Sequence, residues 1–87
     1  MSDKPTLEFP TEFPIKVMGR KDSDIAARAR QIIEKHAGVL NDDQVRERPS
    51  SGANFLALTF VIQATSQAQL DAIYRELTAC DAVLMAL

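Results

Sequence analysis

Residues 55–65 read Phe-Leu-Ala-Leu-Thr-Phe-Val-Ile-Gln-Ala-Thr, which is the strongest strand pattern in the chain. Every second side chain from Leu56 to Ala64 is apolar, which is the period of a β-strand with one buried face. The other face, from Phe55 to Gln63, is only mildly polar. Such a strand fits the centre of a sheet whose second face is partly covered. We therefore expect residues 55–65 to form a central strand.

Two amphipathic helices flank this strand in the sequence, because apolar residues recur at helical spacing before and after it. Ser66 and Gln69 match a capping box that opens the second helix, and Gly38 supplies the stop of the first. The expected bounds are about 23–37 and about 66–79, with Asp22 and Ser23 as cap-forming residues before the first helix.

Three further strands are expected, at about 13–18, 43–48 and 83–87. The 43–48 segment has Val45 as its only large apolar residue. Charged side chains at a sheet edge discourage pairing with other molecules, so this strand belongs at an edge. The last strand is expected to end inside the sheet.

The first twelve residues contain Pro5 and Pro10 and follow neither period. Each proline forbids a helix and favours an extended conformation in the residue before it. We expect residues 1–12 to form an extended arm that Phe9 fixes to the core, with a docking peptide as the alternative. Residues 13–87 then form one domain.

The order of these elements predicts an α+β protein of ferredoxin-like βαββαβ plan. We expect a two-layer sandwich, in which a four-stranded antiparallel sheet carries two helices on one face. The 87 residues, of which 46% are hydrophobic and 25% charged, suffice for one core.

The composition argues against several classes of partner. A formal net charge of −2 provides no field for polyanions, so neither nucleic acid nor an anionic membrane is expected as a partner. No apolar run reaches the roughly 18 residues of a membrane-spanning helix. Cys80 is the one cysteine, and the first residues do not resemble a secretion signal, which together indicate the cytoplasm.

The residues also argue against catalysis, so we expect no enzyme, no metal and no cofactor. His36 is the one histidine and falls in the last turn of the first helix, where the helix dipole favours a C-terminal capping role over a role as catalytic base. One His and one Cys far apart do not make a zinc site. Cys80 is expected to pack in the core.

A basic turn is the candidate small-ligand site. Arg20 and Lys21 precede the first helix, whose free N–H groups could receive a small anion. Asp22 and Asp24 put negative charge at the same place, so a solvated turn is the alternative.

The sheet face turned away from the helices is the candidate partner surface. If alternation places Val83 and Met85 against the helices, the outward residues carry little charge beyond Lys16. A contiguous exposed apolar patch marks an interaction site, for a protein partner or a second copy, unless the arm covers it. The expected partner surface is Lys16, Met18, Ala57, Thr59, Val61 and Leu84. These positions lack the stacking aromatics of an RNA-recognition module.

The chain resembles the uncharacterised bacterial YbeD-like proteins over nearly its whole length. The segments that carry the resemblance are Leu7-Glu8-Phe9-Pro10 through Lys16-Val17-Met18-Gly19, Pro49-Ser50-Ser51 and the last strand. The family continues Pro-Ser-Ser with Gly and then Tyr-x-Ser, whereas this chain reads Gly52-Ala53-Asn54-Phe55-Leu56-Ala57 and lacks both hydroxyls.

The resemblance implies a ferredoxin-like fold similar to ACT regulatory domains and a link to lipoate metabolism, with no established activity. We therefore expect a non-enzymatic binding or regulatory module that acts through its open sheet face. The alternative is a sensor of a small anion or amino-acid-like effector, or a weak hydrolase that resembles acylphosphatases in fold only, using Arg20 and Lys21.

Overall fold

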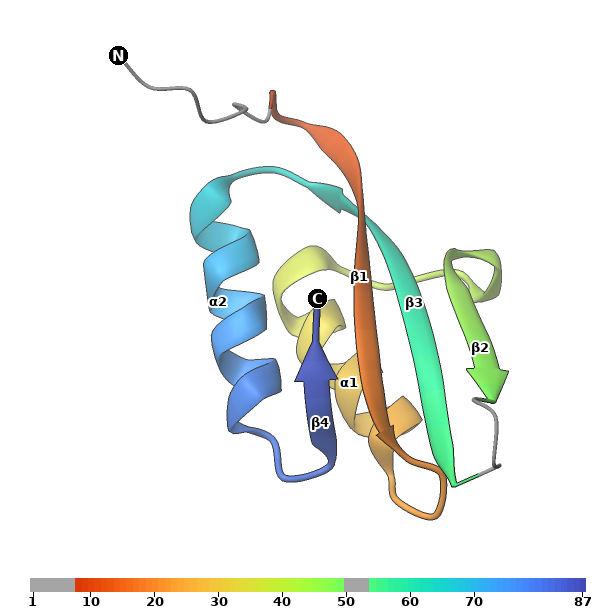
Figure 1. The fold of residues 1–87 in the computed structure, drawn as a ribbon. Helices are drawn as coiled ribbons and strands as arrows, with labels where there is room; N and C mark the ends of the chain where they lie inside the picture. Colours follow the sequence, from red (N-terminus) through yellow and green to blue (C-terminus); the bar gives the residue numbers. More distant parts are fainter. Residues whose placement is uncertain (1–7, 50–53) are drawn as a thin grey trace.

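The computed structural model describes residues 8–49 and 54–87. Its strands form one four-stranded antiparallel sheet in the order β2-β3-β1-β4, and both helices lie on one face of that sheet (Figure 1). This arrangement confirms the ferredoxin-like βαββαβ plan. In chain order the elements are β1 (Thr11–Arg20), α1 (Ile25–Ala37), the 3₁₀ helix η1 (Asp42–Gln44), β2 (Val45–Pro49), β3 (Phe55–Ala64), α2 (Gln67–Ala79) and β4 (Val83–Ala86).

The two central strands, β1 and β3, pair along their whole length, from Thr11 opposite Ala64 to Arg20 opposite Phe55. Pro14 lies inside β1 without breaking this ladder. Lys16 exchanges both backbone hydrogen bonds with Leu87, so its N–H points away from β3. Pro14 is two residues before Lys16, so its backbone nitrogen also points away from β3. The missing N–H of proline therefore costs no hydrogen bond between β1 and β3.

The core lies between the sheet and the two helices. None of the buried residues among those described is polar or charged. The core residues, each at most 3% exposed, are Ile15, Val17, Ile25, Ala29, Ile33, Leu40, Leu58, Phe60, Ile62, Ala64, Leu70, Ile73 and Leu77. The apolar face of residues 55–65 is therefore buried from Leu58 to Ala64, as its period predicts.

The start of α1 differs from the expected cap. Asp24 is the N-cap residue and its side chain makes no capping hydrogen bond. The Ser23 hydroxyl instead donates to the Arg20 carbonyl at 2.6 Å, so it closes the turn after β1 and is not available to the helix. The stop at Gly38 is confirmed: its φ is +87° and its N–H donates to the Glu34 carbonyl.

Gln69 ties the start of α2 to the end of α1. The Ser66 hydroxyl accepts from the Gln69 N–H at 3.1 Å, as a capping box requires. The side-chain oxygen of Gln69 accepts from the backbone N–H of Thr65, not from that of Ser66. The side-chain amide of Gln69 donates to the backbone carbonyl of His36 at 3.0 Å. One side chain therefore satisfies backbone groups at two helix ends.

Two boundaries also shift. η1 takes up Asp42–Gln44, so β2 begins at Val45, later than expected. β1 begins at Thr11, inside the segment expected to be an arm. Phe9 is half-buried and packs against the core, as expected, while residues 1–7 of the arm lie outside the described residues.

Gly19 is required because β1, the start of α1 and the turn before β4 come very close together there. A Cβ there would overlap the Ala82 carbonyl oxygen and would lie 2.7 Å from Cγ1 of Ile25. We predict that Gly19→Ala lowers the free energy of unfolding by about 1–3 kcal/mol, the usual cost of overpacking, measured by urea denaturation.

The double variant Gly19→Ala, Ile25→Val is the control. It removes the Cδ1 contact but leaves the backbone oxygen of Ala82 in place, so it should recover no stability. A Gly19→Ala protein as stable as the wild type would contradict the prediction.

Candidate functional site

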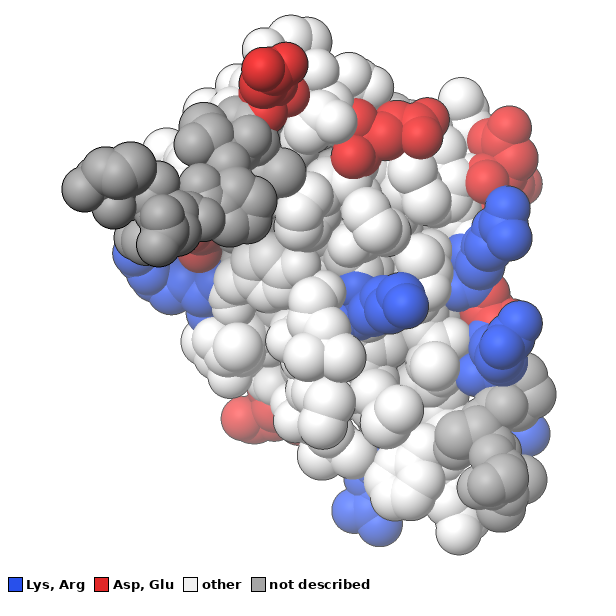
Figure 2. Space-filling view, turned by 45° about the horizontal axis from the view of Figure 1, so that its top comes forward, with Lys and Arg blue, Asp and Glu red and all other residues white. Residues whose placement is uncertain are grey.

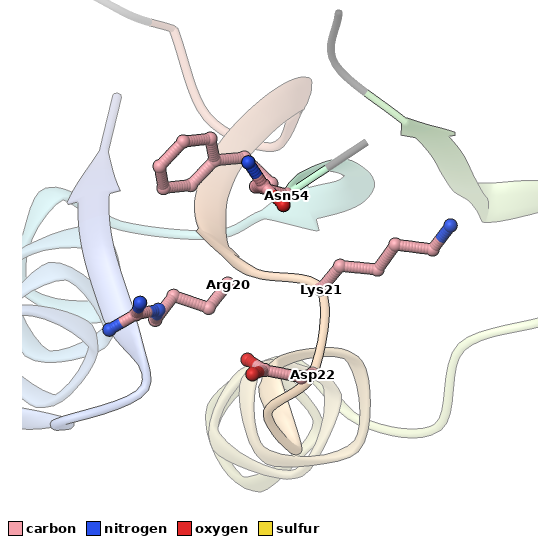
Figure 3. Close-up of a pocket in the computed structure, with 5 residues that line it drawn as sticks. Arg20, Lys21, Asp22 and Asn54 are labelled. Atoms are coloured by element: carbon pink, nitrogen blue, oxygen red, sulfur yellow. The ribbon is translucent and has the colours of Figure 1, made fainter. Parts of the chain in front are cut away.

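The basic turn follows β1 and lines a depression of about 490 Å³ with Asn54 and Phe55. Its two cations do not converge on that depression, because the Arg20 and Lys21 side chains extend in opposite directions (Figure 3). The Asp22 carboxylate lies in the same view between the two stems. An anion could therefore contact either cation but would not be held by both.

The backbone of this turn is also engaged internally. The Lys21 N–H donates to the Asn54 carbonyl at 2.9 Å, and the Ser23 N–H donates to the Arg20 carbonyl at 3.1 Å. Asp24 occupies the N-cap of α1 and already places negative charge at the positive end of the helix dipole. This geometry favours the solvated turn over the anion site.

His36 lies in the last turn of α1, as expected, but it does not cap that helix. Its Nε2 lies 2.5 Å from Glu76 of α2, and the other carboxylate oxygen of Glu76 accepts from Lys35 at 3.1 Å. These two hydrogen bonds, that of His36 first, lower the pKa of Glu76 below its ordinary value. His36 therefore joins the two helices.

The side-chain types that bind metal ions do not gather in one place among the described residues. Within 8–49 and 54–87 there is no group of three His, Cys, Asp or Glu side chains that could hold a metal ion. Cys80 is a free, half-buried thiol at the C-cap of α2, so it is less buried than expected.

The open face, defined as the side of the sheet away from the helices, brings five of the predicted partner residues together. Lys16 pairs with Thr59, and Met18 pairs with Ala57. Lys16, Ala57, Thr59 and Val61 line one hollow, and Lys16, Met18, Ala57 and Thr59 line a second hollow beside it.

The sixth residue, Leu84, lies where the register between β1 and β4 shifts, and it has no partner in β1. It is 56% exposed but does not line either hollow. Met85 lies opposite Met18 and is 50% exposed, so its expected place against the helices is wrong. The irregularity in β4 reverses the alternation that the sequence suggests, and Ala86 packs against the core instead.

The expectation that the open face carries little charge beyond Lys16 is also wrong. Arg46 pairs with Thr59 and Arg48 with Ala57, so both arginines lie on this face. Figure 2 shows a largely white surface with one cationic side chain near its middle and others along the β2 side. Alternation around Val45, which must face the core, was the sequence signal that could have identified them.

These three cations have no ion-pair partner in the part of the chain that the structure describes. Neither Lys16, Arg46 nor Arg48 makes an ion pair or side-chain hydrogen bond with a described residue. Glu47 adjoins them in sequence, but it pairs with the buried Leu58 and so alternates to the other side of the sheet.

Comparisons with known proteins place the chain among uncharacterised bacterial sequences. The profile of a family described as "Protein of unknown function (DUF493)" matches residues 4–87. The UPF0250 protein RSc0326 of Ralstonia nicotianae is 45% identical over 73 residues, which cover 84% of this chain and 75% of that protein. A UPF0250 protein of Chromobacterium violaceum is 41% identical over 81 residues, or 93% of this chain and 91% of that one.

A solved structure supports the fold. The solution structure of protein HP0495 from H. pylori is similar to this chain with a TM-score of 0.74, at 18% identity, over 99% of this chain and 90% of that one. Among the described residues, no helix is long and apolar enough to cross a membrane.

The pair between His36 and Glu76 predicts a pH dependence of stability. Because the folded pKa of Glu76 is lowered, its contribution is complete above the ordinary value of 4.5 and is lost as the pH falls through the folded value. At neutral pH, Glu76→Gln should lower the melting temperature by a few degrees at most, since the pair is partly exposed. The difference from wild type should shrink on acidification, and a difference that grows in acid would contradict this.

The diverging cations of the basic turn predict that it holds no small anion. Titration of the protein with inorganic phosphate at constant ionic strength should give no saturable NMR shift at the backbone amides of residues 19–24. Arg20→Ala should behave identically to wild type. Saturable shifts in the wild type that Arg20→Ala abolishes would restore the anion site.

Proposed function

This chain belongs to the bacterial family of unknown function DUF493, as its resemblance to the YbeD-like proteins predicts, and we propose that it is a non-enzymatic binding module whose open face docks a protein partner. The family name supplies no activity, so the proposal is based on the chain's own surface. The compartment that we propose, from its single cysteine, is the cytoplasm. The link to lipoate metabolism implied by the resemblance stays a prediction.

The observation that carries the proposal is the composition of the open face at its centre. Two small residues, Ala57 and Thr59, lie in the middle of β3 between longer side chains of β1 and β2. They form the floor of two adjoining hollows. The middle of the face is therefore recessed between Lys16 and Met18 on one side and Arg46 and Arg48 on the other, which leaves room for a side chain of a partner.

A different protein suits this face better than a second copy of the chain. The cations lie toward β2 and the exposed apolar side chains toward β4. A two-fold axis parallel to the strands would place Arg46 and Arg48 of one copy near the apolar β4 side of the other, and an axis across the strands would place them near the same arginines of the other. Desolvating these charges without an acidic partner is unfavourable.

The absence of enzymatic activity is part of the same proposal. His36, which is the one histidine of the chain, is engaged by Glu76 at the helix side of the molecule. A small-ligand sensor or hydrolase at Arg20 and Lys21 remains the second candidate. It is less favoured because the two cations point apart (Figure 3).

The test blocks the floor of the open face. A photo-crosslinking residue at position 59 should trap a partner protein in cells, and the same residue at position 28, on α1, should not. With that partner purified, Thr59→Trp should weaken binding by more than about tenfold in calorimetry, because the indole fills the space between the hollows.

Arg28→Trp is the matched control, since it adds the same ring on the helix side of the sheet and should leave the affinity unchanged. Near-identical backbone NMR spectra would establish that both variants are folded. A Thr59→Trp protein that is folded and binds its partner with wild-type affinity would overturn the proposal.

A further inference from the structure

We propose, on the premise that the open face docks a protein, that its occupant is a partner segment that places an acidic side chain over β2, β3 and β1 and a large apolar side chain beside it, over β1 and β4. The acidic group lies between Lys16, Arg46 and Arg48, and the apolar group lies against Met18 and Met85.

The register of the sheet aligns the residues that build this site. Neighbouring strands lie about 4.8 Å apart, so positions on β2 and β1 that share a partner in β3 are about 10 Å apart. One row across the sheet is Arg46, Thr59, Lys16 and Leu87, and the next is Arg48, Ala57, Met18 and Met85.

The β2 side of these rows is the cationic half. Lys16, Arg46 and Arg48 border a hollow of about 610 Å³, whose floor includes Ala57 and Thr59. Glu47 also borders this hollow, but its place in β2 turns it toward the opposite side. Since no described residue pairs with the three cations, a carboxylate from a partner is the complementary group.

The β4 side is the apolar half. Met18, Met85 and Leu87 surround a smaller hollow of about 120 Å³, and Met85 and Leu87 are 50% and 67% exposed. Burying such exposed apolar area under a partner side chain is favourable, and methionine adapts to the shape of what it contacts. The three side chains that give this half its character, those of Met18, Met85 and Leu87, are uncharged.

The two halves belong to one site because they share their central residues. Lys16, Ala57 and Thr59 line both hollows. Lys16 therefore lies at the boundary, where its aliphatic stem can contact the apolar group and its ammonium the acidic one. A free anion would leave the apolar half uncovered, and a purely apolar segment would desolvate the cations without a partner.

The first test selects short random peptides displayed on phage against the immobilised full chain. The enriched peptides should combine Asp or Glu with Leu, Met or Phe. Added to the labelled protein, they should shift the NMR signals of Lys16, Met18, Ala57 and Thr59. Enriched peptides without acidic residues, or shifts confined to the helix side, would overturn the inference.

The second test measures the affinity of one enriched peptide for charge variants. Lys16→Glu and Arg48→Glu should each weaken binding by more than about tenfold, and added salt should reduce wild-type binding. Lys16→Gln, which keeps a polar side chain at this exposed position, should weaken it less. Arg75→Glu, on the exposed side of α2, is the matched control and should have no effect.

Two failures can be told apart. If Thr59→Trp abolishes binding while the charge variants bind as wild type does, the open face is a docking surface and the acidic occupant is wrong. If neither Thr59→Trp nor the charge variants change the affinity, the proposed function fails as well.

Discussion

The continuous pairing of β1 with β3 determines which side chains enter the core and which lie on the open face. The pairs from Thr11 opposite Ala64 to Arg20 opposite Phe55 fix which side chains share a face. A slip by one residue would move Ile15, Val17 and their partners out of the core and bring Lys16 into it. The buried face therefore fixes the open face as well, and the central position of Lys16 follows from the burial of its two neighbours.

The same constraint explains how much of this molecule could be predicted from its sequence. Period-2 and helical apolar patterns identify β3, α1 and α2, because burial against one core imposes those periods directly. The orientation of Met85 could not be predicted in this way. It depends on a local shift of register between β1 and β4. The four residues of β4 are too few for their apolar pattern to indicate such a shift.

The candidate surface shows a second limit of prediction from sequence. A net charge of −2 suggests an acidic molecule, yet the register gathers Lys16, Arg46 and Arg48 on one face. The acidic side chains in the same view lie mostly toward its upper end (Figure 2). Strand order determines which distant residues become neighbours. The net charge of the whole chain therefore does not show the positive potential at one face. The opposite happens at the basic turn, where adjacent Arg20 and Lys21 diverge in space.

Arginines on β2 have a second physical explanation, because charged residues on an edge strand hinder pairing with other molecules. That explanation accounts for Arg46 and Arg48 but not for Lys16. Lys16 lies in β1, which has β3 on one side and β4 on the other, so its backbone is already paired and needs no protection. It also pairs with Thr59 and not with an acidic residue, although an acidic residue there would stabilise the pair. Neither protection of a sheet edge nor an ion pair among the described residues accounts for a lysine at this central position, whereas the acidic occupant that we propose for the open face would account for it.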